Sequence, residues 1–381
     1  MKPGGEMTAA NTRTTRPHEQ FERRVRSSGG RGGGSLCLLV GLVSLLVPSS
    51  AQAESPVRCE ELVFSVSLTP DDPPEHDMAG WLCARGSIHK KTIQVLIHGA
   101  TFDHNYWDFP FEPETYSYVE HMTRAGYAVL NLDRVGYGLS DHPQDGLDVT
   151  LHTGAFTIHQ VVQALRGGQM VVPGFGKLRA KRIQLVGSSL GAFISVIEAS
   201  TYQDVDGVVL TSYSHTVGQG GIESFGLVIP AQEDPKFADF PAINYLSEAP
   251  GAREFLFYHQ PNIDPEVAAL DTALRQTWTV GELNDIIPSL AEPVGIVVPT
   301  LVVVGDFDTI ACDLPCSDTG SLDNEASLYP AEACAEVEII PDAGHALTLH
   351  RNAPDFFAVV KEWSDRRVGA STKHPAPEPC P

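Results

Sequence analysis

Short, almost continuous apolar runs alternate along most of the chain with longer stretches of helical hydrophobic period. The apolar runs cover residues 92–97, 127–133, 182–187, 207–210, 300–304 and 337–340. Helical spacing is found at residues 115–125, 153–165, 190–201 and 353–364. Strands that are apolar at consecutive positions are buried on both faces. The pattern therefore predicts an α/β fold with a mostly parallel sheet and helices on both faces.

Two further strand-like runs, at residues 60–68 and 78–85, are joined by a segment rich in turn-forming residues at 69–74. Cys59 and Cys83 are equidistant from Asp71 in this segment. An antiparallel hairpin would therefore place the two cysteines opposite each other. We predict an amino-terminal hairpin stapled by a Cys59–Cys83 disulfide.

The alternation is interrupted at residues 214–298, which are rich in glycine, proline and aromatic residues and show helical spacing near residues 263–278. We interpret this segment as a helical lid inserted into a core formed by residues 54–213 and 299–365. The alternative is a second independent domain, for which about 85 residues with few strong apolar runs is small. The polar, proline-rich residues 366–381 are expected to form a flexible tail.

The first 53 residues differ in kind from the rest. Several arginines precede an apolar run at residues 36–47, and Ala51-Gln52-Ala53 follows it. This order is typical of a signal peptide, here cleaved near Ala53, and it predicts a secreted or periplasmic protein. An uncleaved anchor is the alternative, but the run is shorter than the roughly 20 residues that a membrane span requires. The pair Arg23-Arg24 leaves Sec and twin-arginine export both open.

The net charge narrows the classes of partner, and the cysteine content bears on disulfides and metal binding. The chain carries 48 acidic and 26 basic residues, a net charge of −22, which disfavours nucleic acid and anionic membranes as partners. Removal of the signal peptide would also remove Cys37 and leave six cysteines, an even number that favours disulfides. The pairing of Cys312, Cys316, Cys334 and Cys380 stays open. Cys312 and Cys316 have no second close pair, so zinc is disfavoured, and neither a metal nor a cofactor is expected.

The segment Gly187-Ser188-Ser189-Leu190-Gly191 lies between an apolar strand-like run and a helical stretch. A Gly-x-Ser-x-Gly motif in that context forms a sharp turn that lifts a nucleophilic serine out of the backbone. Ser189 occupies the serine position. The neighbouring Ser188 does not, because Val186 and Leu190 would then stand where the glycines are needed.

Residues suited to three other roles of a serine hydrolase lie in the elements where these roles are expected. His98-Gly99-Ala100-Thr101 follows an apolar run, and the amides of Ala100 and Leu190 are the predicted oxyanion donors. Asp308, after the run at residues 300–304, is the predicted acid, with Asp306 as the alternative. His345, in the loop that follows the last apolar run, is the predicted base. The order serine, acid, histidine is the one expected of this arrangement.

On these motifs the chain resembles the α/β-hydrolase superfamily of lipases and esterases over roughly residues 92–364, and the hairpin and loop cysteines resemble exported bacterial hydrolases. The resemblance implies an α/β-hydrolase fold and a Ser189–His345–Asp308 triad that cleaves carboxylic esters through an acyl-enzyme. One departure is Ser188, where many members carry histidine or another larger residue.

Other chemistries of a serine nucleophile remain open, namely lactone, amide or carbon–carbon bond cleavage. A non-catalytic binding protein on the same fold is a further alternative. Aromatic residues in the lid and after the oxyanion segment indicate a small-molecule substrate with an apolar group. The oligomeric state cannot be derived from the sequence.

Overall fold

The computed structural model of the chain describes residues 55–373. The predicted signal peptide and Cys380 lie outside the described residues. One eight-stranded sheet organises the chain, in the order β1-β2-β4-β3-β7-β8-β12-β13. Its strands are β1 (Val57–Val66), β2 (His76–Arg85), β3 (Ile93–Ile97), β4 (Ala128–Leu132), β7 (Ile183–Ser188), β8 (Gly207–Thr211), β12 (Thr300–Gly305) and β13 (Glu336–Ile340). The pairs β1–β2 and β2–β4 are antiparallel, and all pairs from β4 to β13 are parallel.

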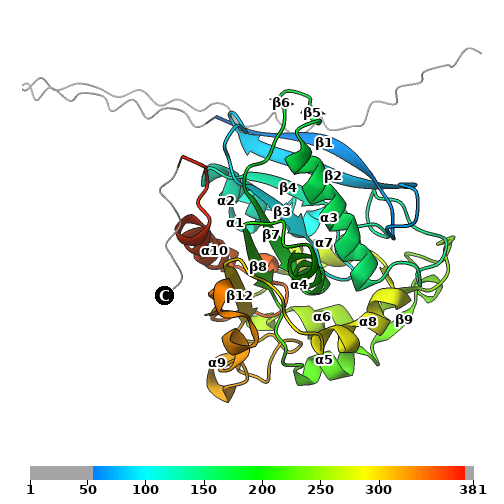
Figure 1. Cartoon of the computed structure of the whole chain (residues 1–381). Coiled ribbons are helices and arrows are strands. Elements are labelled where there is room, and N and C mark those ends of the chain that lie inside the picture. The colour runs from blue at the N-terminus through cyan, green and yellow to red at the C-terminus, as the bar shows by residue number, and fades with distance from the viewer. Residues whose placement is uncertain (1–54, 374–381) are drawn as a thin grey trace, which may run out of the picture. The chain divides into compact units, whose positions relative to one another are not determined.

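Helices cover both faces of this sheet, as the sequence predicts (Figure 1). Alternate residues of the strands belong to two separate cores: Val95 and Ile97 pack with residues of α3 (Leu151–Gly167) and α4 (Leu190–Tyr202). Leu96, between them, packs with residues of α2 (Tyr118–Arg124) and α10 (Ala353–Arg367). The strands are apolar at consecutive positions because both of their faces are buried.

The single helix expected at residues 115–125 is two helices, α1 (Pro113–Tyr116) and α2. Ser117 separates them with an extended backbone, φ −97° and ψ 110°, and its hydroxyl accepts the Glu120 amide hydrogen bond at 2.9 Å. A serine in this position satisfies an amide of the first turn that has no acceptor within the helix. The helical spacing alone does not reveal the break.

The amino-terminal hairpin has the predicted register. Cys59 lies directly opposite Cys83 in the β1–β2 pair, and the two residues form a disulfide. Cys312 and Cys316 form a second disulfide, which decides one of the pairings that the sequence leaves open.

We call residues 214–298 the cap segment. It contains helices, as expected, and also a three-stranded antiparallel sheet in the order β11-β10-β9. Trp278, placed at the end of a helical stretch by its spacing, lies in β11. The elements are α5 (Gln219–Ser224), β9 (Val228–Pro230), β10 (Tyr245–Glu248), α6 (Ala252–Phe257), α7 (Pro265–Leu274), β11 (Trp278–Thr279) and α8 (Val280–Leu290). These strands are too short to show an alternating pattern in the sequence.

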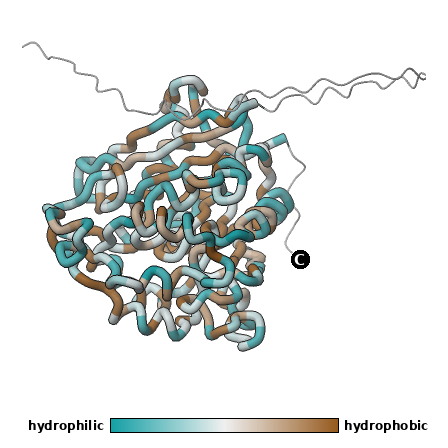
Figure 2. The backbone as a smooth tube through the Cα atoms, turned by 180° about the vertical axis from the view of Figure 1, so that it is seen from behind, coloured by the Kyte–Doolittle hydropathy of each residue, from teal (hydrophilic) through white to brown (hydrophobic). Residues whose placement is uncertain are grey.

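The remaining elements are short. They are β5 (Val171–Val172), β6 (Gly176–Lys177), α9 (Cys316–Thr319) and the 3₁₀ turns His104–Tyr106, Ala231–Glu233, Gln260–Asn262, Glu325–Leu328, Ala331–Ala333 and Leu347–Leu349. Hydrophobic and hydrophilic stretches alternate along the backbone (Figure 2). Within residues 55–373, no helix combines the length and apolarity that a membrane crossing needs.

Candidate active site

Ser189 stands at the turn between β7 and α4, with φ 53° and ψ −119°. A positive φ is strained for a residue with a side chain, and such strain persists only where the surrounding structure imposes it. The neighbours impose it here: a Cβ at Gly187 would collide with the Gly191 carbonyl, and a Cβ at Gly191 would collide with the Ile97 carbonyl. The two glycines of the motif are therefore required by close backbone approaches.

Residues 98–101, which we call the oxyanion loop after their predicted role, lie against this turn. A Cβ at Gly99 would stand 3.0 Å from the Cβ of Ser189, so Gly99 allows the two segments to approach. Ala100 and Leu190, the predicted donors, both line the same pocket as Ser189. Leu190 is the first residue of α4, and the amides of a first helical turn have no acceptor within the helix. Such amides can stabilise an oxyanion.

Asp308 and His345 lie together in the structure, although 37 residues separate them. The Nδ1 atom of His345 is 2.8 and 2.9 Å from the two carboxylate oxygens of Asp308. Asp308 also accepts hydrogen bonds from the amides of Ile310 and Ala311, at 3.0 and 3.1 Å. Both residues are buried. The Nε2 atom of His345 has no hydrogen-bond partner among the described residues.

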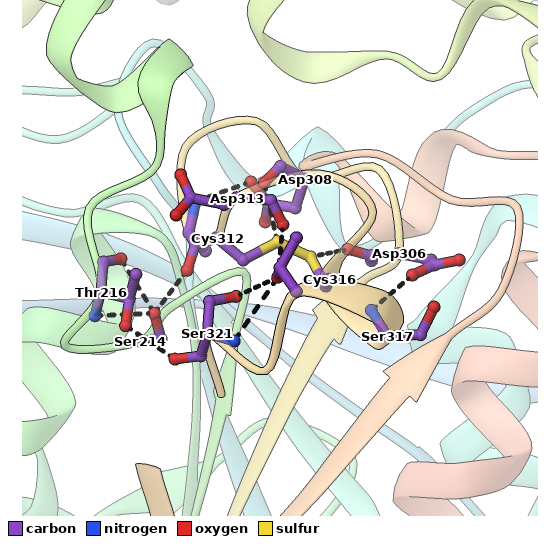
Figure 3. The surroundings of a disulfide bond; sticks show 12 residues. Ser214, Thr216, Asp306, Asp308, Cys312, Asp313, Cys316, Ser317 and Ser321 are labelled. Carbon is purple, nitrogen blue, oxygen red and sulfur yellow. Dashed lines mark hydrogen bonds between the residues drawn. A yellow bond between two sulfur atoms is a disulfide. The ribbon is translucent and has the colours of Figure 1, made fainter. Parts of the chain in front are cut away.

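Asp306, the alternative acid, has a different set of contacts. Its carboxylate accepts the Ser317 amide at 2.9 Å, and its carbonyl accepts the Cys316 amide at 2.9 Å (Figure 3). The Cys312 amide hydrogen bonds to the carbonyl of Asp308. The backbone amides of the two bridged cysteines, Cys312 and Cys316, thus donate to the backbone carbonyls of Asp308 and Asp306 respectively.

His345 is held from two further sides. Its carbonyl accepts a hydrogen bond from the hydroxyl of Ser212. Its ring stacks on Phe257 of the cap segment, with 5.6 Å between ring centroids and 23° between planes. Phe257 also lines the pocket of Ser189, so this ring contacts the histidine on one side and borders the space beside the serine.

The oxyanion loop rests on a buried ion pair. Arg134 donates to the carbonyls of His98 and Gly99, at 3.0 and 3.3 Å, and to the carboxylate of Glu282 in α8. His98 accepts the Arg134 amide hydrogen bond through Nε2. Burial and the charge of Arg134 lower the pKa of His98 to about 3. His98 therefore stays neutral beneath the loop.

A second buried network reaches the loop from the cap segment. Arg253 of α6 donates two hydrogen bonds to Asp271, at 2.6 and 2.8 Å, two to Glu248, and one to the hydroxyl of Thr101. Thr101 has a positive φ of 58°. Sequence reasoning missed this network, because a charged residue in a polar segment carries no local sign that it is buried.

The pocket beside Ser189 is mostly apolar, and many of its lining residues belong to the cap segment. Its apolar lining includes Phe193, Phe225, Leu256, Phe257, Trp278 and Ile286. Glu248 and Thr101 supply polar groups to the same lining. Ser188 is not part of it: its hydroxyl donates to Tyr106 at 3.1 Å, beneath the oxyanion loop. The departure from larger residues at this position thus falls outside the pocket wall.

Comparisons with known proteins agree with this architecture. Three solved structures align over most of the chain: an esterase from Thermogutta terrifontis (18% identity, TM-score 0.51, 80% of this chain and 97% of the other), a monoacylglycerol lipase from Paleococcus ferrophilus (16%, 0.50, 76% and 98%), and an α/β-hydrolase-fold protein from Chitinophaga pinensis (14%, 0.52, 81% and 98%). At these identities they show the fold alone. No curated protein matches the chain. A family model described as the alpha/beta hydrolase family matches residues 94–360, which is more than half of the chain. The chain belongs to the α/β-hydrolase family.

Proposed function

We propose that the protein is an exported serine esterase in which Ser189 is the nucleophile, His345 the general base and Asp308 the residue that orients the imidazole. One observation carries the proposal: the strained serine lines an apolar pocket with Ala100 and Leu190, and Phe257 of the same lining stacks on the imidazole of the buried aspartate–histidine pair. A hydrolase needs these groups together, because a serine hydroxyl is a weak nucleophile without a base and an oxyanion site.

The reaction begins when His345 Nε2 takes the proton of the Ser189 hydroxyl. The oxygen attacks the ester carbonyl, and the amides of Ala100 and Leu190 stabilise the oxyanion that forms. Asp308 fixes the imidazole with a proton on Nδ1 and stabilises its cation. His345 then protonates the departing alcohol, and water releases the acyl group by the same route. His345 Nε2 is buried and unpartnered among the described residues, so its hydrogen bond to the Ser189 hydroxyl would form in the complex with substrate, where catalytic hydrogen bonds commonly tighten.

The preferred substrate is an ester with an apolar group. The pocket lining combines aromatic and aliphatic side chains from the cap segment with few polar groups, and burial of an apolar chain there removes it from water. The names of two structural neighbours, an esterase and a monoacylglycerol lipase, point to the same bond type. Export is supported by the two disulfides, which persist in oxidising compartments.

The test is covalent labelling with a fluorophosphonate, combined with hydrolysis of p-nitrophenyl esters of increasing acyl length. We expect labelling at Ser189 and loss of at least about 10³-fold in kcat for Ser189→Ala, as is typical of triad serines. Ser188→Ala, one residue away and outside the pocket, should keep labelling and most of the activity. A Ser189→Ala variant with full turnover would exclude the proposal. Absence of labelling in a folded wild-type protein would favour a non-catalytic binding protein.

Lactone and amide panels run in the same assay separate the remaining chemistries. An ester and a lactone both have an alkoxide as leaving group, whereas an amide requires protonation of a much poorer leaving group. We expect esters to be cleaved with the highest kcat/KM. Preference for lactones or amides would keep the triad and correct the substrate.

A further inference from the structure

An imidazole and two carboxylates converge between α3 and α4, on the side of α4 away from the turn at Ser189. His159 belongs to α3, Glu198 to the last part of α4, and Asp204 to the connection from α4 to β8. One candidate ligand atom from each residue, a ring nitrogen of His159 and a carboxylate oxygen of the other two, lies within 4.8 Å of the others. No interaction of the candidate active site involves these residues.

The cluster lacks hydrogen-bond donors for its oxygens. Glu198 is fully buried, and neither of its carboxylate oxygens has a hydrogen-bond partner among the described residues. Asp204 Oδ1 is also without a partner there. Asp204 Oδ2 accepts a hydrogen bond from Gln163 at 2.6 Å. His159 Nδ1 lies 2.9 Å from the same oxygen but has no hydrogen-bond partner among the described residues. A buried carboxylate without a donor is costly, so a proton or a cation must lie between these groups.

A nearby basic residue does not supply the missing donor. Arg166 donates to the carbonyl of Asp204 at 2.8 Å and to the carboxylate of Asp206 at 2.7 Å. Its guanidinium is therefore directed to the backbone and to the adjacent aspartate, and Glu198 keeps two unpartnered oxygens.

A comparable cluster elsewhere shows what a satisfied arrangement looks like. Asp103, His104 and Asp133 also bring three candidate ligand atoms together. There, Asp133 accepts from the His104 amide, the His104 ring and the Leu139 amide. Asp103 accepts from Asn105 and Gln276. That cluster has donors for its carboxylate oxygens and needs no further ligand.

The imidazole of the first cluster is fixed in orientation. The ring of His159 stacks on Tyr202, with 3.9 Å between centroids and 15° between planes. Gln163 holds the Asp204 carboxylate from the side. Partners that orient the ligands in this way are a regular feature of metal sites.

We propose that His159, Glu198 and Asp204 form a binding site for a divalent transition-metal cation, with Zn²⁺ as the best match. Zn²⁺ accepts both imidazole nitrogen and carboxylate oxygen, and three protein ligands leave a further position open to water. Ca²⁺ and Mg²⁺ prefer ligands that are all oxygen. The expectation that the protein has no metal was derived from the spacing of its cysteines, which take no part in this cluster. The site would join α3 to α4, and its proposal is independent of the proposed esterase activity.

The competing state is a proton in place of the cation. Burial, together with the charge of Asp204, raises the pKa of Glu198 to about 9, so Glu198 without a cation would be protonated at neutral pH. A proton shared by the two carboxyl groups, however, would not account for His159 Nδ1, which lies 2.9 Å from Asp204 Oδ2 but makes no hydrogen bond among the described residues.

The test is a titration of the full chain, prepared without a histidine tag and stripped with a chelator, with ZnCl₂ in a calorimeter and in a thermal unfolding assay. We expect one Zn²⁺ bound per chain and a rise in the unfolding temperature. Glu198→Gln and His159→Ala should each weaken binding by at least tenfold. His152→Ala is the matched control, because His152 also lies on α3 and contacts two carboxylates, Asp285 and Glu292, at the surface.

Three outcomes would overturn the proposal: no saturable Zn²⁺ binding by the wild type, equal binding by Glu198→Gln, or loss of binding in His152→Ala alone. Circular dichroism of the chelator-treated variants establishes that each is folded. Should Glu198→Gln not fold, Asp204→Asn takes its place with the same expected loss. Ester hydrolysis by the wild type, with and without Zn²⁺, tests the esterase separately.

Discussion

Arg253 Nη1 donates a 2.8 Å hydrogen bond to the hydroxyl of Thr101 and thereby joins the cap segment to the oxyanion loop. The guanidinium is buried, and its other donors are taken up by Asp271 and Glu248. It also lies over the rings of Phe102 and Phe257, at 4.4 and 5.1 Å from their centroids. Phe257 in turn stacks on His345. One side chain therefore contacts the supports of both the oxyanion loop and the candidate base.

Replacement of Arg253 by methionine should lower both stability and turnover. Removal of one partner of a buried ion pair leaves charges without a counterion and costs about 3–5 kcal/mol. Loss of the Thr101 contact should reduce kcat more than it raises KM, because the loop acts on the transition state. Urea unfolding and ester kinetics measure the two effects. Arg253→Lys keeps the charge without the planar fork and should recover part of each. An Arg253→Met variant with wild-type kcat would show that Thr101 is held by other contacts.

The two aspartates after β12 offer a matched pair of variants. Asp308→Asn should lower kcat by about 10⁴-fold, because an amide no longer fixes the imidazole with its proton on Nδ1. Asp306→Asn keeps a side-chain oxygen that can accept from the Ser317 amide and removes only the charge, so it should leave kcat within about tenfold of the wild type and cost at most about 1 kcal/mol of stability. The measurement is p-nitrophenyl ester hydrolysis by folded protein. The reverse ranking would assign the acid to Asp306.

The two disulfides should contribute differently to stability and to activity. Cys59–Cys83 has a sequence separation of 24 and Cys312–Cys316 a separation of 4, so loop closure predicts that their removal costs about 3.5 and about 2 kcal/mol respectively. Activity should respond in the opposite order, because only Cys312–Cys316 is hydrogen bonded to the backbone of Asp306 and Asp308. The test is to replace both cysteines of each disulfide by serine and to compare the two variants by urea unfolding and by kcat, which should rank them in opposite orders. Equal losses of kcat would show that the Asp308 loop does not depend on its disulfide.

His104 should make stability depend on pH. Burial lowers its pKa, but the hydrogen bond and charge of Asp133 outweigh burial and raise the pKa above the ordinary value of 6.5. A raised histidine pKa stabilises the fold fully below about pH 6.5, and this contribution is lost as the pH rises through the folded-state pKa. The difference in unfolding free energy between wild type and His104→Gln should therefore be about 2 kcal/mol at pH 5.5 and smaller at pH 8.5. His89→Gln, at an exposed site, should show no such trend. A pH-independent difference would contradict the prediction.

The sequence predicted the central sheet well because its strands are buried on both faces, which leaves a run such as Ile93–Ile97 apolar throughout. The hairpin register followed from equal distances to a turn. The break at Ser117 and the small sheet of the cap segment were not predictable, because a single capping hydroxyl and strands of two to four residues have no periodicity.

The candidate site likewise contains residues that the sequence predicts and contacts that it does not. Ser189, Asp308 and His345 each follow a strand, so a local pattern marks them. Arg253 and its partner Thr101 are 152 residues apart, and nothing near either residue indicates the contact. Glu198 lies within a helical stretch where a glutamate is ordinarily exposed, and its burial depends on packing against α3. Pairing between distant charged residues requires the three-dimensional structure.

The Arg134–Glu282 ion pair bears on how a substrate would reach the pocket. Glu282 belongs to the cap segment and Arg134 to the core, and both are buried. A swing of the whole cap segment away from the core would break this buried ion pair, so the pair holds the cap segment against the core. Phe225 and Ile287 line the pocket yet are 40% and 54% exposed, and side chains at such positions change rotamer within nanoseconds. If the protein is the proposed esterase, we expect substrates to enter by movement of a few exposed side chains at the pocket, with the cap segment kept in place by its buried ion pair.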